Sequence, residues 1–99
     1  MKIAILGYGN IGRAAEEAIK AAPDMELAGI YHHNEINDQM VNDLDVVLIC
    51  TPTREVQKFA TVLAARGICT VDSFDIHGQI WSLRSALDPV CQTNKAVSI

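Results

Sequence analysis

Residues 2–18 read KIAILGYGNIGRAAEEA and carry glycines in G-x-G-x-x-G spacing, at Gly7, Gly9 and Gly12. A short apolar run precedes the first glycine. A helical repeat of apolar residues follows, at Ile11, Ala14, Ala15, Ala18, Ile19 and Ala22. In this context the motif predicts the first strand, turn and helix of a parallel sheet that binds a dinucleotide. Gly7 would permit the tight turn, Gly9 the approach of a pyrophosphate, and Gly12 the close packing of helix on strand. A tight turn without a ligand remains the alternative.

The rest of the chain alternates apolar runs with helical patterns, which is typical of an α/β fold. Besides Lys2–Leu6, the predicted strands are Glu26–Tyr31, Asp45–Cys50, Ile68–Asp72 and Lys95–Ile99. Two further helices are predicted at Thr53–Arg66, with Val56, Phe59, Ala60, Leu63 and Ala64 on one face, and at Gln79–Leu87. We therefore expect a Rossmann-like parallel sheet of about five strands in the order 2-1-3-4-5. The polar stretch 32–42 reads mostly as loop, so the fold is abbreviated between strands two and three.

Length and composition indicate one globular domain, residues 1–99, since 49% of the residues are hydrophobic and 20% are charged. The net charge of -4 argues against nucleic-acid and anionic-membrane partners. We find no membrane span and no secretory signal. The three cysteines Cys50, Cys69 and Cys91 are far apart in the sequence. We expect them to be buried, reduced thiols of a cytoplasmic protein, with no zinc site.

The end of the second predicted strand bears on the choice of cofactor. An NAD site usually has a carboxylate there, bonded to the ribose 2′-hydroxyl, but this chain has Tyr31, His32, His33 and Asn34. The two histidines can donate hydrogen bonds to a 2′-phosphate, so the sequence favours NADP. Because Glu35 is close by, NAD is also possible. The alternative for the two histidines is that they lie in a solvated loop and bind no cofactor.

Two more segments lie after predicted strands, where open parallel sheets bind ligands. Cys50-Thr51-Pro52-Thr53 can contact the ribose or nicotinamide of a cofactor, or Thr51 and Thr53 can cap a helix. VDSFDIHGQ, residues 71–79, places Asp72, Asp75 and His77 close together. Carboxylates there can bind an ammonium group, although such side chains are also common as caps or solvated groups. Ser73 has no neighbouring base that would make it a nucleophile.

Four stretches, taken together, resemble the amino-terminal part of meso-diaminopimelate D-dehydrogenase: IAILGYGNIGR, PDMELAGI, DVVLICTPT and TVDSFDIH. The resemblance covers essentially the whole chain. It implies an NADP-dependent enzyme that oxidatively deaminates the D-configured carbon of meso-2,6-diaminopimelate to L-2-amino-6-oxopimelate and ammonia, in the lysine pathway. It also implies a homodimer whose second domain provides much of the substrate pocket.

The resemblance assigns roles to individual residues. Cofactor contacts are implied for the glycine loop and for the turn after strand three: Gly7, Tyr8, Gly9, Asn10, Ile11, Thr51, Pro52 and Thr53. We expect Gly12, Cys50 and Ser73 to contribute to the same cofactor site. Asp75 matches an aspartate near the amino group at the D-centre, and Asp72 and Phe74 line the same turn. His32 and His33 stand where the family often has two arginines that grip the 2′-phosphate, and Gln79 stands where some members are acidic.

The family continues, after a strand like KAVSI, into a Gly-Trp-Asp-Pro-Gly stretch and a second domain, which this sequence does not contain. We therefore expect a chain that binds a nucleotide but does not turn over diaminopimelate unaided. A stand-alone NAD(P)-sensing module is an alternative. So is the cofactor lobe of another dehydrogenase, such as dihydrodipicolinate reductase or the glucose-fructose oxidoreductase group. We also expect self-association through apolar surface that includes Leu87, Val90 and Val97.

Overall fold

The computed structural model describes residues 1–32, 44–72 and 76–99. These residues form strands β1 (Lys2–Leu6), β2 (Glu26–Tyr31), β3 (Val46–Ile49) and β4 (Cys69–Asp72). The helices are α1 (Asn10–Ala21), α2 (Val56–Ala64) and α3 (Ile80–Asn94). A 3₁₀ turn, Thr53–Glu55, leads into α2, and another, His77–Gln79, leads into α3. Strand and helix alternate as the sequence predicts, and residues 33–43 of the polar stretch lie outside the described part of the chain.

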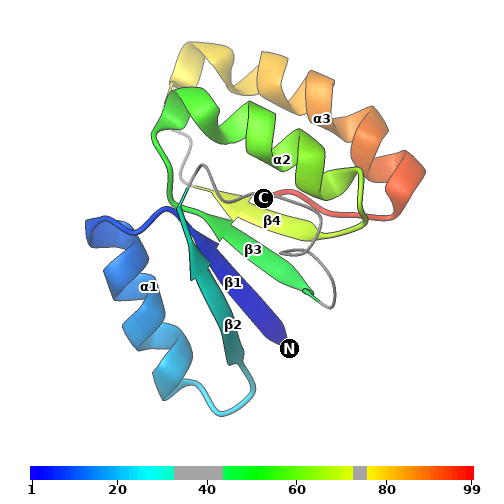
Figure 1. Cartoon of the computed structure of the whole chain (residues 1–99). Helices are drawn as coiled ribbons and strands as arrows, with labels where there is room; N and C mark the ends of the chain where they lie inside the picture. The colour runs from blue at the N-terminus through cyan, green and yellow to red at the C-terminus, as the bar shows by residue number, and fades with distance from the viewer. Residues whose placement is uncertain (33–43, 73–75) are drawn as a thin grey trace.

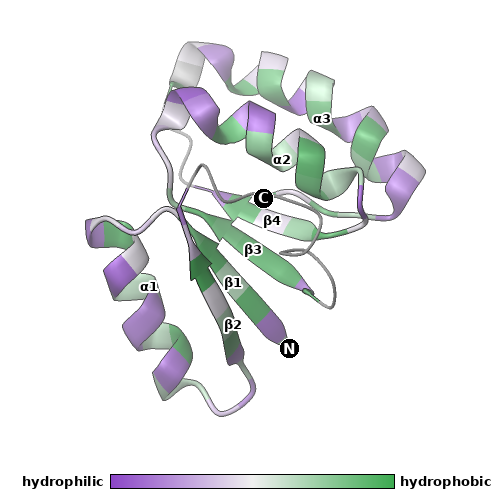
Figure 2. Cartoon of the chain, viewed as in Figure 1, coloured by the Kyte–Doolittle hydropathy of each residue, from purple (hydrophilic) through white to green (hydrophobic). Residues whose placement is uncertain are grey.

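The four strands form one parallel sheet in the order β2-β1-β3-β4, which confirms the predicted order of the first four strands. Helix α1 covers one face of the sheet, and α2 and α3 cover the other (Figure 1). Side chains alternate between the two faces along each strand. In β1, Ile3 and Ile5 therefore pack in a cluster with Ile19 of α1, whereas Ala4 and Leu6 pack in a cluster with α2 and α3. Strands β1 and β3, in the middle of the sheet, are the most continuously hydrophobic of the four (Figure 2), as expected for a sheet covered on both faces.

The expected fifth strand, Lys95–Ile99, was wrong in extent. The segment does lie beside β4, where Thr70 N–H donates to Val97 O and Ile99 N–H donates to Thr70 O, both at 2.9 Å. However, only Ser98 forms a parallel bridge, to Thr70, so the segment is not a strand of the sheet. Helix α3 uses the residues up to Asn94, and Lys95, with φ of 56°, turns the chain out of the helix.

Helix α3 is longer than the predicted Gln79–Leu87, because it continues through Pro89 to Asn94. Proline inside a helix removes one hydrogen bond and crowds the preceding turn, so continuing the helix through Pro89 has a local cost. The buried side chains Leu83, Leu87 and Cys91 keep the helix packed on either side of that proline. Tertiary contacts therefore outweigh the local preference.

The predicted burial of α2 is confirmed, since all five residues of its apolar face are buried. The prediction for α1 was only partly right. Ile19 and Gly12 are buried, but Ile11 is 58% exposed and Ala14 and Ala18 are also exposed. Sequence spacing alone cannot show which part of a broad, alanine-rich face meets the sheet.

The cysteines are all free thiols, as expected. Their predicted burial holds fully for Cys91, whereas Cys50 and Cys69 are half-buried. Burial raises the pKa of the Cys91 and Cys50 thiols, which keeps both protonated at neutral pH.

Candidate nucleotide-binding site

The glycine loop lies where the carboxyl ends of three parallel strands meet. The Gly7 N–H donates to Tyr31 O at the end of β2, at 2.7 Å. The Cys50 N–H, just after β3, donates to Leu6 O at 2.8 Å. These two bonds continue the ladders beyond the strands, so that the loop after β1 is fastened to its neighbours on both sides.

Gly7 and Gly12 are required by the backbone at this point. Gly7 has φ of 92°, and a Cβ there would lie 2.9 Å from the carbonyl carbon and oxygen of Cys50. A Cβ on Gly12 would lie 2.5 Å from Gly7 O. The first result confirms the predicted tight turn. The second shows that α1 packs directly against the loop as well as against the strand.

The start of α1 is open toward solvent. Gly9 is the N-cap residue, has no side-chain cap bond, and a Cβ built on it meets nothing within 4 Å. Arg13 N–H makes an early helical bond to Gly9 O, at 3.0 Å, and the N–H groups before it lie at the helix end. Tyr8, Asn10 and Ile11 are exposed around this end. The arrangement is the one that binds phosphate groups through backbone N–H donors and the helix dipole.

Thr51 lies next to this loop and is 8% exposed, and its hydroxyl has no hydrogen-bond partner among the described residues. The suggested capping role of Thr51 is therefore wrong, because a capping hydroxyl would accept a backbone bond. Leaving a buried hydroxyl unpaired costs about 1–3 kcal/mol, so a bound ligand that bonds to it gains correspondingly. The sequence suggested this contact as an alternative. It gave no hint that Oε2 of Glu55, one turn on, is also buried and unpaired.

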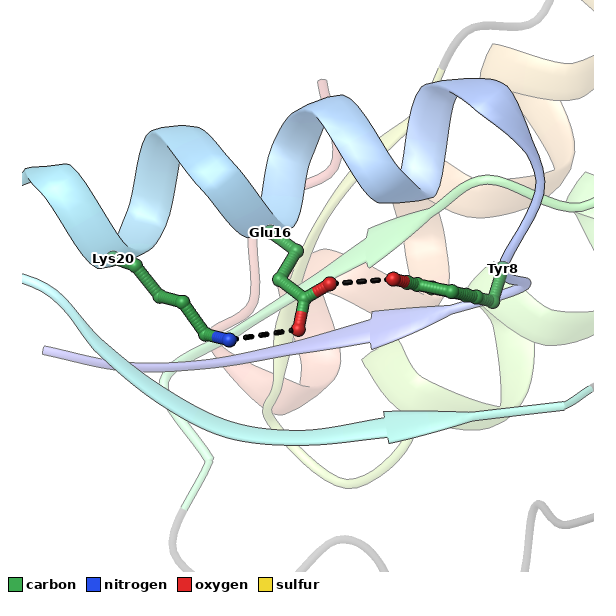
Figure 3. A network of polar contacts seen from close by, with 3 residues as sticks. All are labelled: Tyr8, Glu16 and Lys20. Carbon is green, nitrogen blue, oxygen red and sulfur yellow. Dashed lines mark hydrogen bonds and ion pairs between the residues drawn. The ribbon is translucent and has the colours of Figure 1, made fainter.

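Tyr8 is held against α1 by a chain of polar contacts (Figure 3). Its hydroxyl donates to Oε1 of Glu16 at 2.5 Å, and Oε2 of Glu16 pairs with Lys20 Nζ at 3.0 Å. The guanidinium of Arg13 lies 5.6 Å from the centre of the Tyr8 ring. The bond to Glu16 raises the pKa of Tyr8, and the Tyr8 hydroxyl, followed by Lys20, lowers the pKa of Glu16. Sequence reasoning missed this cluster, although Arg13 and Glu16 stand at i, i+3 spacing, close behind the glycines.

The structure describes only some of the site residues predicted at the ends of β2 and β4. His32 follows β2 and is exposed, next to the strand end to which Gly7 is bonded. Asp72 ends β4 and is half-buried, and its N–H donates to Ile99 O at 2.9 Å. It also lines a pocket of about 570 Å³ between α3 and the C-terminal segment 96–99. The remaining members, His33, Ser73, Phe74 and Asp75, lie outside the described residues.

Residues 1–32, 44–72 and 76–99 contain no group of three or more His, Cys, Asp or Glu side chains that could hold a metal ion. None of the helices in these segments is both long and apolar enough to cross a membrane.

The chain is similar over its whole length to several dehydrogenases, whereas no family model matches it. The meso-diaminopimelate D-dehydrogenase of Bacteroides fragilis is 45% identical, with 100% of this chain and 38% of the relative covered. A structure of the C. glutamicum diaminopimelate dehydrogenase in complex with DAP has a TM-score of 0.80 at 29% identity, over 99% of this chain and 34% of that one. An engineered D-amino acid dehydrogenase bound to NADP+ has a TM-score of 0.78 at 28% identity, over 99% of this chain and 35% of that one.

The chain thus spans little more than a third of the length of the curated relatives that it matches along its entire length. The parallel sheet, the glycine loop and the order of the strands agree with that match. Over its whole length, this chain is a relative of the amino-terminal lobe of the meso-diaminopimelate D-dehydrogenases.

Proposed function

We propose that this chain is the NADP-binding lobe of a dehydrogenase that acts on the D-centre of meso-2,6-diaminopimelate. The observation that carries the proposal is the juxtaposition of an open α1 N-terminus with the buried, unpaired hydroxyl of Thr51. The first is built for a phosphate group, and the second requires a polar partner. Support also comes from the relatives, since one similar structure contains NADP+ and another contains DAP.

In this proposal the glycine loop and the turn after β3 bind different parts of the cofactor. The backbone at Gly9, Asn10 and Ile11 holds the pyrophosphate, while Gly7 and Gly12 keep the loop in its shape. Thr51, with Cys50, Pro52 and Thr53 on the same turn, orients the nicotinamide end. The bound nicotinamide supplies the hydride acceptor. Everything that the chain does is therefore binding and orientation.

The substrate residues remain a prediction. Asp75, with Asp72 and Phe74, is expected to bind the amino group at the D-centre, because a carboxylate pairs with an ammonium group at short range. The rest of the substrate pocket would come from the additional length that the relatives have. We further propose that the whole protein is a cytoplasmic homo-oligomer.

Nucleotide binding by the 99-residue chain tests the proposal directly. Titration with NADPH is expected to give a saturable change in nicotinamide fluorescence. The Gly9→Ala variant is expected to weaken binding by tenfold or more while keeping the Tm, because its added methyl occupies open space that the pyrophosphate would fill. Val62→Ala is the control, since Val62 is exposed on α2 and belongs to none of the segments assigned to the site. The absence of saturable binding of both NADPH and NADH would overturn the proposal.

A further inference from the structure

Arg13 stands directly after the third glycine and has a basic side chain without a carboxylate partner in the described part of the chain. Two carboxylates on the same helix are spaced to pair with it, Glu16 at three positions on and Glu17 at four, but Arg13 forms an ion pair with neither. Both carboxylate oxygens of Glu16 are already engaged, one by the Tyr8 hydroxyl and the other by Lys20. The guanidinium of Arg13 lies instead over the face of the Tyr8 ring, 5.6 Å from its centre.

This contact holds the guanidinium while leaving its donors available. A cation over an aromatic face is attracted by the ring, and this attraction uses none of the N–H groups of the guanidinium. The ring in turn is anchored, because the Tyr8 hydroxyl is bonded to Glu16 and Glu16 is bonded to Lys20 (Figure 3). Arg13 can therefore offer its N–H donors to an anion.

The cluster lies near the end of β2. Tyr8 follows Gly7, whose N–H is bonded to Tyr31 O, and His32 follows Tyr31. In dinucleotide-binding folds the adenosine ribose lies at the end of this strand, and an arginine nearby accommodates a 2′-phosphate. The pyrophosphate, by contrast, is met by backbone N–H groups at the helix start. An anion beside Arg13 is thus the phosphate on the ribose rather than the bridging phosphates.

We propose that Arg13 binds the 2′-phosphate of NADP and sets the preference for NADP over NAD, with Tyr8, Glu16 and Lys20 as its positioning residues. This inference rests on the proposed nucleotide-binding function. It adds a cation on α1 to His32, which follows β2.

Dissociation constants for NADPH and NADH, measured side by side, test the inference. Arg13→Gln is expected to weaken NADPH binding by about tenfold to a hundredfold, the range for losing a charged hydrogen bond, and to change NADH binding by less than about twofold. Arg84→Gln is the matched control, because Arg84 is stacked in the same way over Trp81, at 5.1 Å, but lies on α3. It is expected to leave both constants unchanged. The Tm of each variant, measured in parallel, shows that the fold is intact.

Two more variants separate charge from geometry. Arg13→Lys keeps the charge but loses the planar fork, and should restore only part of the preference. Tyr8→Phe keeps the ring but loses the bond to Glu16, and should lower NADPH affinity less than Arg13→Gln does. Equal weakening of NADPH and NADH by Arg13→Gln, or no change in either, overturns the inference but not the proposed function. A wild-type chain that binds neither nucleotide overturns both.

Discussion

Gly12 illustrates how one hydrogen atom in place of a side chain determines the geometry of the loop. A Cβ there would lie 2.5 Å from Gly7 O, a backbone atom that cannot rotate away. We expect Gly12→Ala to lower the free energy of unfolding by about 1–3 kcal/mol, as overpacking of a tight site does. Urea denaturation measures this, and Gly9→Ala, with open space at its Cβ, serves as the comparison. Equal stability of the two variants would contradict the packing argument.

Tyr8 provides a prediction of pH dependence. Its pKa is raised above the ordinary 10.0, mainly because its hydroxyl donates to the Glu16 carboxylate. A raised pKa means that the folded state holds the proton more tightly. The contribution of this bond to stability is therefore present below pH 10 and is lost as the pH rises through the pKa of folded Tyr8.

Tyrosinate absorbance tests this in a Tyr31→Phe background, where Tyr8 is the remaining tyrosine. The midpoint is expected above 10, and Glu16→Gln should lower it toward the ordinary value. A midpoint that Glu16→Gln does not move would show that the bond does not persist in solution. At acid pH the sign is opposite for Glu16, since its lowered pKa gives a contribution that is lost as the pH falls through that pKa.

Among the helices, α2 makes the larger buried contact with the sheet. Leu63 is fully buried, in a cluster that also contains Val47, Ile49 and Phe59. We expect Leu63→Ala to cost about 2–5 kcal/mol, because it leaves a cavity between the helix and the strands. Val62 is 36% exposed on the same helix, and Val62→Ala should cost much less. Chemical denaturation measures the free energy of unfolding of both variants. An equal loss of stability in the two would contradict the burial of Leu63 against the sheet.

At the scale of the whole molecule, the edge of the sheet beyond β4 is incompletely covered. Val97 is 55% exposed and Ile99 is 76% exposed in the segment that pairs with β4. Val90 is half-buried, and Leu87, expected at this surface, is only 5% exposed and belongs to the core, so that part of the expectation was wrong. Apolar side chains along a sheet edge favour association with another chain.

We therefore expect the 99-residue chain to self-associate as its concentration rises. Sedimentation equilibrium measures this, and Val97→Lys is expected to weaken it, because a charge at a sheet edge opposes pairing with another chain. Lys58→Arg, on the outer side of α2, is a control that should leave association unchanged. A sharp monomer at all concentrations would contradict the expectation.

Much of this molecule could be predicted from local pattern. The bounds of β1 and β2 agree with the apolar runs, and the buried face of α2 follows its helical spacing. In these elements the residues that are apolar in the sequence pattern are the ones that the fold buries. The prediction was wrong at the carboxyl end of the chain. The helical spacing ended at Leu87, whereas packing carries α3 through Pro89 to Asn94, and the expected fifth strand is reduced to one bridge between Ser98 and Thr70.

By itself, the sequence determined the strand-turn-helix start, the parallel order of the four strands and the family resemblance. Each of these depends on the spacing of residues along the chain. Only the tertiary structure decided that Gly12 packs on the backbone of Gly7, that the Thr51 hydroxyl is buried without a partner, and that Arg13 rests on Tyr8 while Glu16 is engaged by Tyr8 and Lys20. Close approach, burial and the competition of several donors for one carboxylate depend on distances in space, and residue spacing does not specify those distances.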